Sequence, residues 1–415
     1  MRIRRIISLL LAITILLGIF ICNVYAADDS WKPKNNEPFV FVHGLNGWGG
    51  AEGINGIVPY WGATTGDLMS YLQSEGYECY SASVGPLSSA WDRACELYAQ
   101  LIGSTVDYGV AHSQEHNHDR YGRTYYQALV PDWGELDENG KIQQIHLIGH
   151  SFGGTTVRML IHLLTDGDSK EIAATSSNDI SGLFTGGKGG WVKSATTVCA
   201  PHNSSSIYYP LKALGLYEVV QNISFLYAGI FGRSFFNGRL VDFHLEQFGL
   251  TDVFNGEKAD SLIESMVRVQ QNLDDTCIYD LTPEGTAKLN SDCKINKDIY
   301  YFSYPFTTTV KTGLFGIEIP DIRTNPIIYL TALVMGFMPE FTDPHTGVVY
   351  DEKWHANDAL VNTESAKYPI GEPHKDYDES NIDKGVWNVM PVQKGDHGAA
   401  IGLFSDEEQI KSFYL

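Results

Sequence analysis

The pentapeptide Gly-His-Ser-Phe-Gly at residues 149–153 constrains the fold of this chain more than any other feature. It fits the pattern G-x-S-x-G, and it lies between an apolar segment that ends near Ile148 and a segment with helical spacing that opens with Gly154. The two glycines permit a tight strand-to-helix turn that exposes a strained serine, and the start of the helix adds partial positive charge beneath it. We therefore predict that Ser151 is a catalytic nucleophile.

Helix-like and strand-like segments alternate around this motif. Strands are expected at 38–42, 77–84 and 144–149, and helices at 67–75, 89–103 and 155–164. This rhythm is typical of a parallel sheet that helices cover on both faces. The predicted fold class is α/β, of the α/β-hydrolase type with a mostly parallel central sheet.

Three segments interrupt the rhythm. The segment at about 104–130 is rich in Tyr, Gly and His, and it is expected to be an insertion outside the sheet. In the segment at about 203–236, five apolar residues could line one side of a helix, namely Leu211, Leu214, Val219, Ile223 and Leu226. A movable helical lid and an ordinary core helix fit this spacing equally well. A third apolar stretch, 327–338, is far too short to span a bilayer.

Residues 1–26 have the pattern of a signal peptide. Arginines precede an apolar run from Ile6 to Ile21, and small residues lead to an expected cleavage after Ala26. The run is short for a permanent membrane anchor. We expect residues 27–415 to form a single secreted, extracellular domain. Loss of three arginines would move the formal charge from −21 to −24, which argues against nucleic acid or anionic phospholipid as a partner.

Cysteine usage does not indicate a disulfide framework. Five cysteines remain after residues 1–26 are removed, and an odd number cannot pair completely. A bridge between Cys277 and Cys293 stays open, because the expected compartment is oxidising. Small buried apolar residues are the preferred interpretation of these thiols.

The nucleophile needs a base, an acid and an oxyanion hole. In this fold the order along the chain is Ser, then Asp or Glu, then His. His397 lies in a loop ahead of a short C-terminal helix, and Asp358 precedes an apolar step, although the pattern alone leaves His374 and Asp351 as alternatives. Two backbone amides are expected to hold the oxyanion, that of Phe152 and that of Leu45, which follows the first strand.

Several long motifs resemble the zinc-containing true lipases of the Geobacillus and Staphylococcus type. The most specific are Val84-Gly-Pro-Leu-Ser-Ser, Trp91-Asp-Arg-Ala-Cys-Glu96, Thr105-Val-Asp-Tyr-Gly109, Tyr60-Trp61-Gly62, Ala200-Pro201-His202 and Lys384-Gly-Val-Trp-Asn388. The resemblance covers nearly all of residues 27–415. It implies the triad Ser151, Asp358 and His397 and the oxyanion donors Leu45 and Phe152.

The resemblance also implies a structural zinc ion. The matching ligands are Asp92, His112, His118 and Asp275, and two carboxylates with two imidazoles can complete a closed tetrahedral site. The family binds calcium through carboxylates two and seven positions beyond the catalytic histidine. Ala399 and Phe404 stand there and cannot ligate a hard cation, so we predict that the calcium site is absent. Phe152 replaces a usually polar residue and is expected to make the rim of the site more apolar.

The expected function is hydrolysis of acylglycerol esters by a secreted lipase or carboxylesterase. Its partner would be a lipid or another hydrophobic ester, including at an oil–water interface, without nucleic acid and without a stable membrane anchor. An esterase or polyesterase that acts on short-chain or polymeric esters is the alternative with the same machinery. A non-catalytic secreted binding protein that kept the fold is a third interpretation.

Overall fold

The computed structural model describes residues 33–216, 242, 244–249, 268, 271–313 and 316–415. The chain divides into a unit Met1–Lys34 and a unit Asn35–Leu415, and the elements below belong to the second unit. The expected signal peptide, residues 1–26, lies outside the described residues and stays a prediction.

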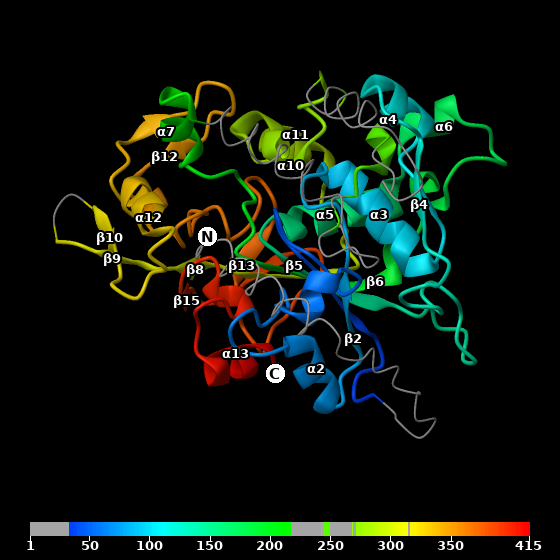
Figure 1. Ribbon diagram of the computed structural model, residues 1–415, viewed down its shortest axis with the longest axis horizontal. Helices are drawn as coiled ribbons and strands as arrows, with labels where there is room; N and C mark the ends of the chain where they lie inside the picture. Colours follow the sequence, from blue (N-terminus) through cyan, green and yellow to red (C-terminus); the bar gives the residue numbers. More distant parts are fainter. Residues whose placement is uncertain (1–32, 217–241, 243, 250–267, 269–270, 314–315) are drawn as a thin grey trace, which may run out of the picture. The chain divides into compact units, whose positions relative to one another are not determined.

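A seven-stranded sheet forms the centre of the unit (Figure 1). Its order is β13-β14-β7-β6-β5-β1-β2, and each of these neighbours pairs in parallel. The strands are β1 (Phe39–Val42), β2 (Cys79–Ala82), β5 (Ile145–His150), β6 (Val192–Val198), β7 (Tyr300–Tyr304), β13 (His374–Asp376) and β14 (Trp387–Val389). The predicted parallel sheet is confirmed, and the three predicted strands correspond to β1, β2 and β5.

Helices cover both faces of this sheet. Helices α3 (Ala90–Ile102) and α5 (Phe152–Asp166) share one core with β1, and α2 (Leu68–Ser74) and α13 (Glu407–Tyr414) share the other. Further helices of the described residues are α6 (Ser169–Ala174), α7 (Tyr208–Ala213), α10 (Cys277–Asp280), α11 (Pro283–Asp292) and α12 (Tyr329–Gly336). The three predicted helices correspond to α2, α3 and α5. Across the described ranges, no helix has both the length and the apolar character that crossing a membrane requires.

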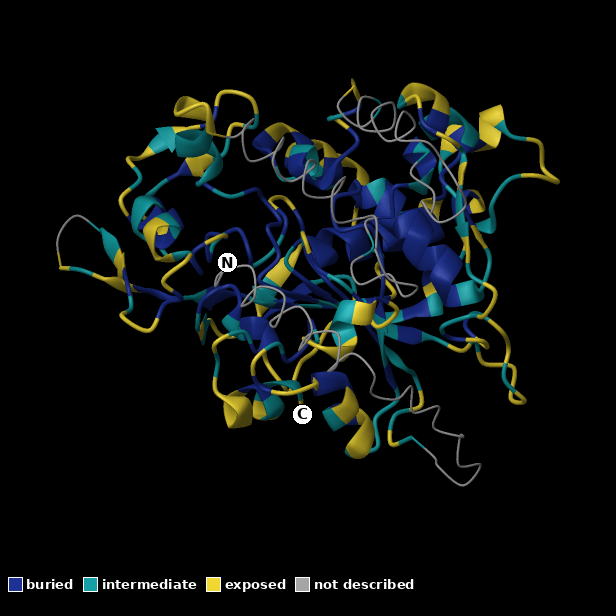
Figure 2. Ribbon diagram, in the orientation of Figure 1, coloured by how far each residue is buried: buried dark blue, intermediate teal, exposed yellow. Residues whose placement is uncertain are grey.

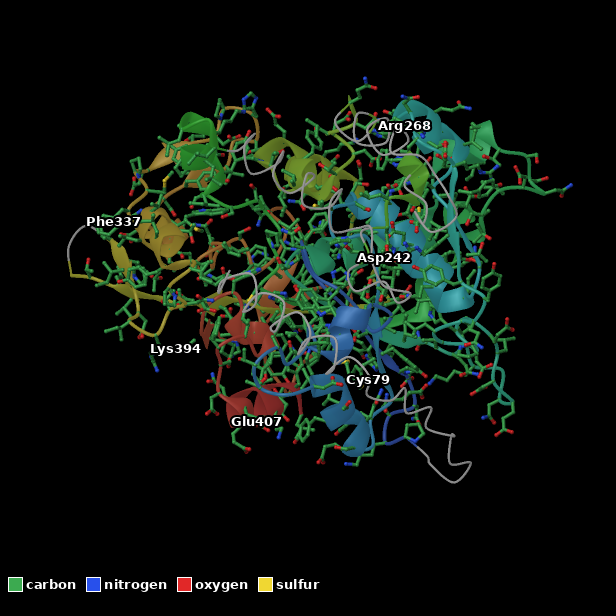
Figure 3. All side chains as sticks on the ribbon, in the orientation of Figure 1. Cys79, Asp242, Arg268, Phe337, Lys394 and Glu407 are labelled. Carbon is green, nitrogen blue, oxygen red and sulfur yellow. The ribbon has the colours of Figure 1, made fainter. Side chains whose placement is uncertain are left out.

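Strand β1 contributes to two separate cores because successive side chains of a strand point to opposite faces. Val40 and Val42 lie in a core with α3 and α5, two helices that are drawn mostly in the dark blue of buried residues in Figure 2. Phe41 lies in a second core with residues of α2 and α13. The loop after β1 is therefore fixed from both sides of the sheet.

The insertion predicted at 104–130 lies outside the central sheet, as expected. It is more regular than predicted, because β3 (Thr105–Asp107) and β4 (Tyr121–Thr124) form an antiparallel pair around α4 (Val110–Glu115). Other two-stranded sheets join β8 (Phe306–Thr307) with β15 (Gln393–Lys394), β9 (Thr309–Lys311) with β10 (Glu318–Pro320), and β11 (Phe341–Thr342) with β12 (Val349–Tyr350).

The predicted lid segment, 203–236, is described only up to residue 216. This part contains α7, where Leu214 is 72% exposed, while Val219, Ile223 and Leu226 lie outside the described residues. The third apolar stretch, 327–338, contains α12. Two of its apolar side chains are exposed to solvent, Ile327 at 83% before the helix and Leu330 at 67% within it.

The five cysteines between Cys79 and Cys293 are free and buried. The bridge that the sequence left open between Cys277 and Cys293 is not formed. The Cys277 thiol instead lies 3.8 Å from the carbonyl oxygen of Pro86, and Cys293 accepts a hydrogen bond at its carbonyl from Arg158. The preferred interpretation of these residues as buried, non-bridging side chains is confirmed.

Candidate active site

Ser151 occupies a sharp turn between β5 and α5. Its backbone angles, φ 55° and ψ −128°, are rare for a residue with a side chain. A Cβ atom on Gly149 would lie 2.4 Å from the backbone of Gly153, and one on Gly153 would lie 2.2 Å from the carbonyl oxygen of Val42. The two motif glycines are therefore required because the turn closes on itself and on the end of β1.

His397 and Asp358 form a hydrogen-bonded pair. Nδ1 of His397 lies 2.8 Å from Oδ2 of Asp358, and the His397 amide donates to the Asp358 carbonyl at 2.7 Å. The other carboxylate oxygen, Oδ1, accepts the amides of Leu360 and Val361 at 3.0 and 2.7 Å. Both side chains are buried. The amides of its own loop thus hold the Asp358 carboxylate in place, and this carboxylate orients the imidazole of His397.

The two alternatives that the sequence left open have other local roles. The carboxylate of Asp351 caps a short 3-10 helix, Glu352–Trp354, by accepting the Lys353 amide at 3.0 Å. His374 belongs to β13 at the edge of the sheet, where its ring stacks on Tyr368. The geometry favours the pair of His397 and Asp358.

The loop after β1 lies directly against Ser151. A Cβ atom on Gly44 would be 2.8 Å from the Cβ atom of Ser151, which brings the neighbouring Leu45 to the same place. The amide of Phe152 belongs to the first turn of α5, where backbone amides have no partner within the helix. These positions are compatible with the two predicted oxyanion donors.

The expected role of the Phe152 side chain is not met. The side chain is completely buried in the core, with the Arg93 guanidinium 5.3 Å from its ring centroid, and so it does not line a rim. Arg93 itself donates to the carbonyl oxygens of His43 and Gly85 and to the hydroxyl of Thr156. The role of Arg93 could not be predicted from its motif, because nothing in the local sequence shows that its side chain reaches the turn after β1.

The four predicted metal ligands come together. Nitrogen and carboxylate oxygen atoms of Asp92, His112, His118 and Asp275 all lie within 4.8 Å of one another. Asp92 comes from the first turn of α3, His112 from α4, and Asp275 from the segment before α10. Nε2 of His112 lies 3.2 Å from Oδ1 of Asp92 and 3.4 Å from Oδ1 of Asp275. By its donor set, the arrangement could hold a metal ion.

The surroundings of this cluster fit a divalent cation. Nδ1 of His118 bonds the carbonyl oxygen of Asp119 at 2.9 Å, which directs Nε2 into the cluster as a ligand. That Nε2 atom lies 3.3 Å from Oδ2 of Asp275, and neither of these buried atoms makes a hydrogen bond. Burial lowers the pKa of His112, but the carboxylates of Asp275 and Asp92 outweigh it and raise that pKa to about 10. A bound cation would neutralise these buried carboxylates directly.

The residues at the two positions of the family's calcium carboxylates lie near the end of the chain. Ala399 belongs to a 3-10 helix, Ala399–Ile401, and the side chain of Phe404 is 66% exposed. Both line a cleft of about 520 Å³ together with Arg323 and Lys394. Asp321, Asp396 and Asp406 line the same cleft, so the absence of a calcium site stays a prediction.

The parallel sheet, the strained serine turn and the buried His–Asp pair define a protein of the α/β-hydrolase class. The chain belongs to the family described as lipase-like, C-terminal domain, whose model matches residues 35–413. It is 37% identical over 385 residues to a lipase of Staphylococcus hyicus, and the aligned region covers 91% of this chain and 55% of that lipase. The predicted resemblance to Staphylococcus-type lipases is confirmed.

Solved structures agree with this assignment. The crystal structure of Staphylococcus hyicus lipase matches with a TM-score of 0.78 and 33% identity, covering 94% of this chain and 96% of the other. EstA from Clostridium botulinum matches with a TM-score of 0.75 and 36% identity, covering 93% and 87%. This chain spans about half the length of the curated relatives it matches, 55% and 51%.

Proposed function

We propose that the chain is a secreted lipase or carboxylesterase that hydrolyses acylglycerol esters through an acyl-enzyme on Ser151. One observation carries this proposal, the 2.8 Å hydrogen bond between His397 and Asp358. It occurs in a lipase-family fold in which the G-x-S-x-G turn of the described residues holds Ser151 in a strained conformation. An imidazole oriented by a buried carboxylate is what a serine needs to become a nucleophile.

In the first step, His397 accepts the proton of the Ser151 hydroxyl through Nε2 while the serine oxygen attacks the ester carbonyl carbon. Asp358 holds the proton on Nδ1, which keeps Nε2 free to accept, and stabilises the imidazolium that forms. The amides of Leu45 and Phe152 donate to the oxyanion. The imidazolium then gives its proton to the leaving alcohol, and the acyl group stays on Ser151.

In the second step, water replaces the alcohol. His397 takes a proton from this water as it attacks the acyl carbon, the same amides hold the second oxyanion, and Ser151 leaves with the proton from His397. The carboxylic acid is released. Both steps use the side chains of Ser151, His397 and Asp358 and the two backbone amides, with the ester and water as the reactants.

We propose that the cluster of Asp92, His112, His118 and Asp275 holds a structural zinc ion. Zinc accepts imidazole and carboxylate ligands in a closed tetrahedral site, and there it would supply cross-linking rather than an activated water. The cluster joins α3, α4 and the segment before α10. Its role would be to fasten the insertion at 104–130 to the core.

We propose that apolar segments control access of lipid to the site, within 203–236 and in 327–338. The exposed side chains of Leu214, Ile327 and Leu330 support this role, because apolar groups in solvent gain free energy when they meet a lipid surface. Trimming 206–216 or replacing Ile327 and Leu330 by Ser should reduce hydrolysis of emulsified esters more than that of soluble ones. An unchanged ratio would contradict the lid role.

The exposed apolar side chains also favour a second candidate. Exposed apolar side chains can contact a polymer film as well as an oil droplet, so the second candidate is an esterase or polyesterase with the same triad. Rates on a long-chain triglyceride emulsion, a soluble short-chain ester and a polyester film would separate the candidates. A lipase should prefer the emulsion to both other substrates.

The primary experiment labels the purified protein with an active-site phosphonate and locates the adduct by mass spectrometry. We expect one adduct, on Ser151, and loss of both labelling and hydrolysis in Ser151→Ala. A folded protein that is not labelled at Ser151 would overturn the catalytic proposal and favour a binding protein that kept the fold.

A further inference from the structure

A continuous chain of hydrogen bonds runs through the interior beside Ser151. The amide of Gly44 lies 2.9 Å from the hydroxyl oxygen of Tyr60, and this oxygen lies 2.7 Å from Nδ1 of His150. Nε2 of His150 lies 3.1 Å from the carbonyl oxygen of His397. Tyr60 and His150 are both buried. The sequence offered no signal for this chain, because 90 residues separate its two side chains.

The protons in this chain can be assigned from its ends. The Gly44 amide can only donate, so the Tyr60 oxygen accepts there and its own proton is donated to Nδ1 of His150. The His397 carbonyl can only accept, so Nε2 of His150 must carry a proton. Each group is then satisfied once. His150 is consequently a neutral imidazole with its proton on Nε2.

Electrostatics agree with this assignment. Burial, reinforced by the nearby His397 ring, holds the pKa of His150 well below its ordinary value, which keeps the ring neutral. Burial likewise raises the pKa of the Tyr60 hydroxyl, so it retains the proton that it donates. The direction of the hydrogen bonds is therefore stable around neutral pH.

The two ends of this chain belong to the parts that must hold fixed positions around Ser151. Gly44 immediately precedes Leu45 in the loop after β1, and His397 carries the imidazole that pairs with Asp358. A Cβ atom on Gly44 would lie 3.1 Å from the Tyr60 hydroxyl as well as 2.8 Å from Ser151. The hydrogen-bonded chain thus links the oxyanion loop to the backbone of the base.

We propose that Tyr60 and His150 are positioning residues, which hold the loop of Leu45 and the backbone of His397 in register with Ser151. The inference rests on the proposed function, because it takes Leu45, Ser151 and His397 as the reacting groups. Neither Tyr60 nor His150 touches the ester. Their contribution is made in the transition state, when the oxyanion must meet donors at fixed distances.

Removal of the Tyr60 hydroxyl leaves two buried groups without a partner, the Gly44 amide and Nδ1 of His150. The loop after β1 can then relax away from Ser151. Loss of a whole oxyanion donor costs about 10²- to 10³-fold in kcat, so a displaced donor should cost about 10- to 100-fold. KM should change little, because substrate binding does not use these bonds.

The experiment compares Tyr60→Phe with Tyr301→Phe. Tyr301 is a buried tyrosine of β7 whose hydroxyl accepts a backbone amide, that of Asn296 at 2.8 Å, and β6 separates β7 from β5, the strand that leads to the serine turn. Both variants therefore lose a bond from a backbone amide, and Tyr60→Phe also loses the bond to Nδ1 of His150. Kinetics on a soluble short-chain ester, the rate of phosphonate labelling and Tm are measured for each.

We expect Tyr60→Phe to lower kcat and the labelling rate together by about 10- to 100-fold, while Tyr301→Phe changes only Tm. His150→Gln, which can still donate toward the His397 carbonyl, gives a second variant if Tyr60→Phe does not fold. The double variant of Tyr60→Phe and His150→Gln should lose no more kcat than the more damaged of the two single variants, because the two side chains act as a unit. Equal kcat in Tyr60→Phe and Tyr301→Phe, or additive losses, would overturn the proposal.

The wild-type protein and Ser151→Ala keep the two levels of inference apart. If phosphonate labels Ser151 and Ser151→Ala is inactive, a normal kcat in Tyr60→Phe refutes the positioning role alone. If wild type is not labelled at Ser151, the proposed function itself fails.

Discussion

Nε2 of His244 lies 3.4 Å from Oε1 of Glu52 in the interior of the protein. On the opposite edge of the ring, Nδ1 lies 3.4 Å from Oε2 of Glu96. Burial and the Arg123 guanidinium lower the pKa of His244, but Asp242, Glu96 and Glu52 outweigh them and raise it to about 9. The position of the His244 ring between two buried glutamates and its raised pKa both favour a charged imidazolium at the start of the segment 244–249.

This imidazolium predicts a loss of stability at alkaline pH. The unfolded histidine has a pKa of about 6.5, so the folded value of about 9 means that protonation stabilises the folded state. That stability is fully present below about pH 6.5 and is lost as pH rises through about 9. The difference in unfolding free energy between wild type and His244→Gln should shrink over this range. Urea denaturation at a series of pH values measures it.

His162→Gln is the matched control for that series. His162 pairs only with Asp166, one turn further along α5, and the carboxylate of Asp166 is largely exposed. Its substitution should have a small effect on stability. A His244→Gln difference that is the same at neutral pH and above pH 9 would contradict the assignment of an imidazolium.

The pairing of His397 with Asp358 predicts the outcome of replacing the acid. Asp358→Asn keeps an oxygen to accept the Leu360 and Val361 amides, but it can no longer hold the proton of the imidazole on Nδ1. We expect kcat to fall on the order of 10³- to 10⁴-fold with a folded protein. Steady-state kinetics on a soluble ester, together with circular dichroism, check this.

Asp351→Asn and His374→Asn are the controls for the triad. The carboxylate of Asp351 caps its own 3-10 helix, and the His374 ring stacks on Tyr368 at the sheet edge. Both variants should keep near-normal kcat. Strong inactivation by either, with Asp358→Asn or His397→Asn still active, would reassign the acid or the base.

The metal cluster predicts one zinc ion per chain. Elemental analysis should find it in wild type and not in His118→Ala, which lacks the buried Nε2 atom of one predicted ligand. A metal present at a thousand times its Kd stabilises a protein by about 4 kcal/mol, so chelation should lower Tm markedly. Activity of the chelated protein well below its Tm should persist if the metal is structural.

His116→Ala is the control for the metal experiment. His116 lies two positions from His118 and its ring packs on that of His112, yet its Nδ1 atom lies 3.8 Å from Asp274 and it is not among the four grouped residues. This variant should retain zinc and its response to chelator. Wild-type protein that is folded and active without zinc would leave the triad intact and remove the metal proposal.

Calcium should have no effect on stability. Ala399 and Phe404 offer no oxygen from their side chains, and Arg323 and Lys394 line the same cleft. Thermal denaturation in millimolar calcium and in magnesium should therefore give the same Tm. A Tm that rises with calcium concentration, and not with magnesium, would show that Asp406 or another nearby carboxylate provides a site.

Local patterns made part of this site predictable. The turn at Ser151 could be recognised because strand, turn and helix are contiguous in sequence, so that two glycines and an apolar run describe the geometry directly. Asp358 and His397 followed from the order of the triad, but the pattern alone could not reject Asp351 or His374. Their rejection needs the three-dimensional arrangement, because capping and stacking partners are not encoded by spacing.

Distant contacts were not predictable from the residues themselves. Asp92 and Asp275 are 183 positions apart and became candidate ligands only through a family resemblance. Arg93, Tyr60 and His150 were in view as motif residues, yet their roles depend on which carbonyls and hydroxyls face them in the folded chain. The burial of Phe152 was missed for the same reason: the residue after a nucleophile can point either into the core or out of it.

The close approach of backbone to backbone around Ser151 has a consequence for laboratory evolution of this protein. At Gly149 and Gly153 even one added carbon atom would meet main-chain atoms, and such atoms cannot be moved by changing a neighbouring side chain. In a random library, most substitutions at these two positions should therefore give inactive protein. Substitutions that change the substrate range should instead be found at the solvent-facing apolar positions of α12 and of the β9–β10 hairpin, where side chains can vary. Such substitutions should leave the catalytic chemistry unchanged.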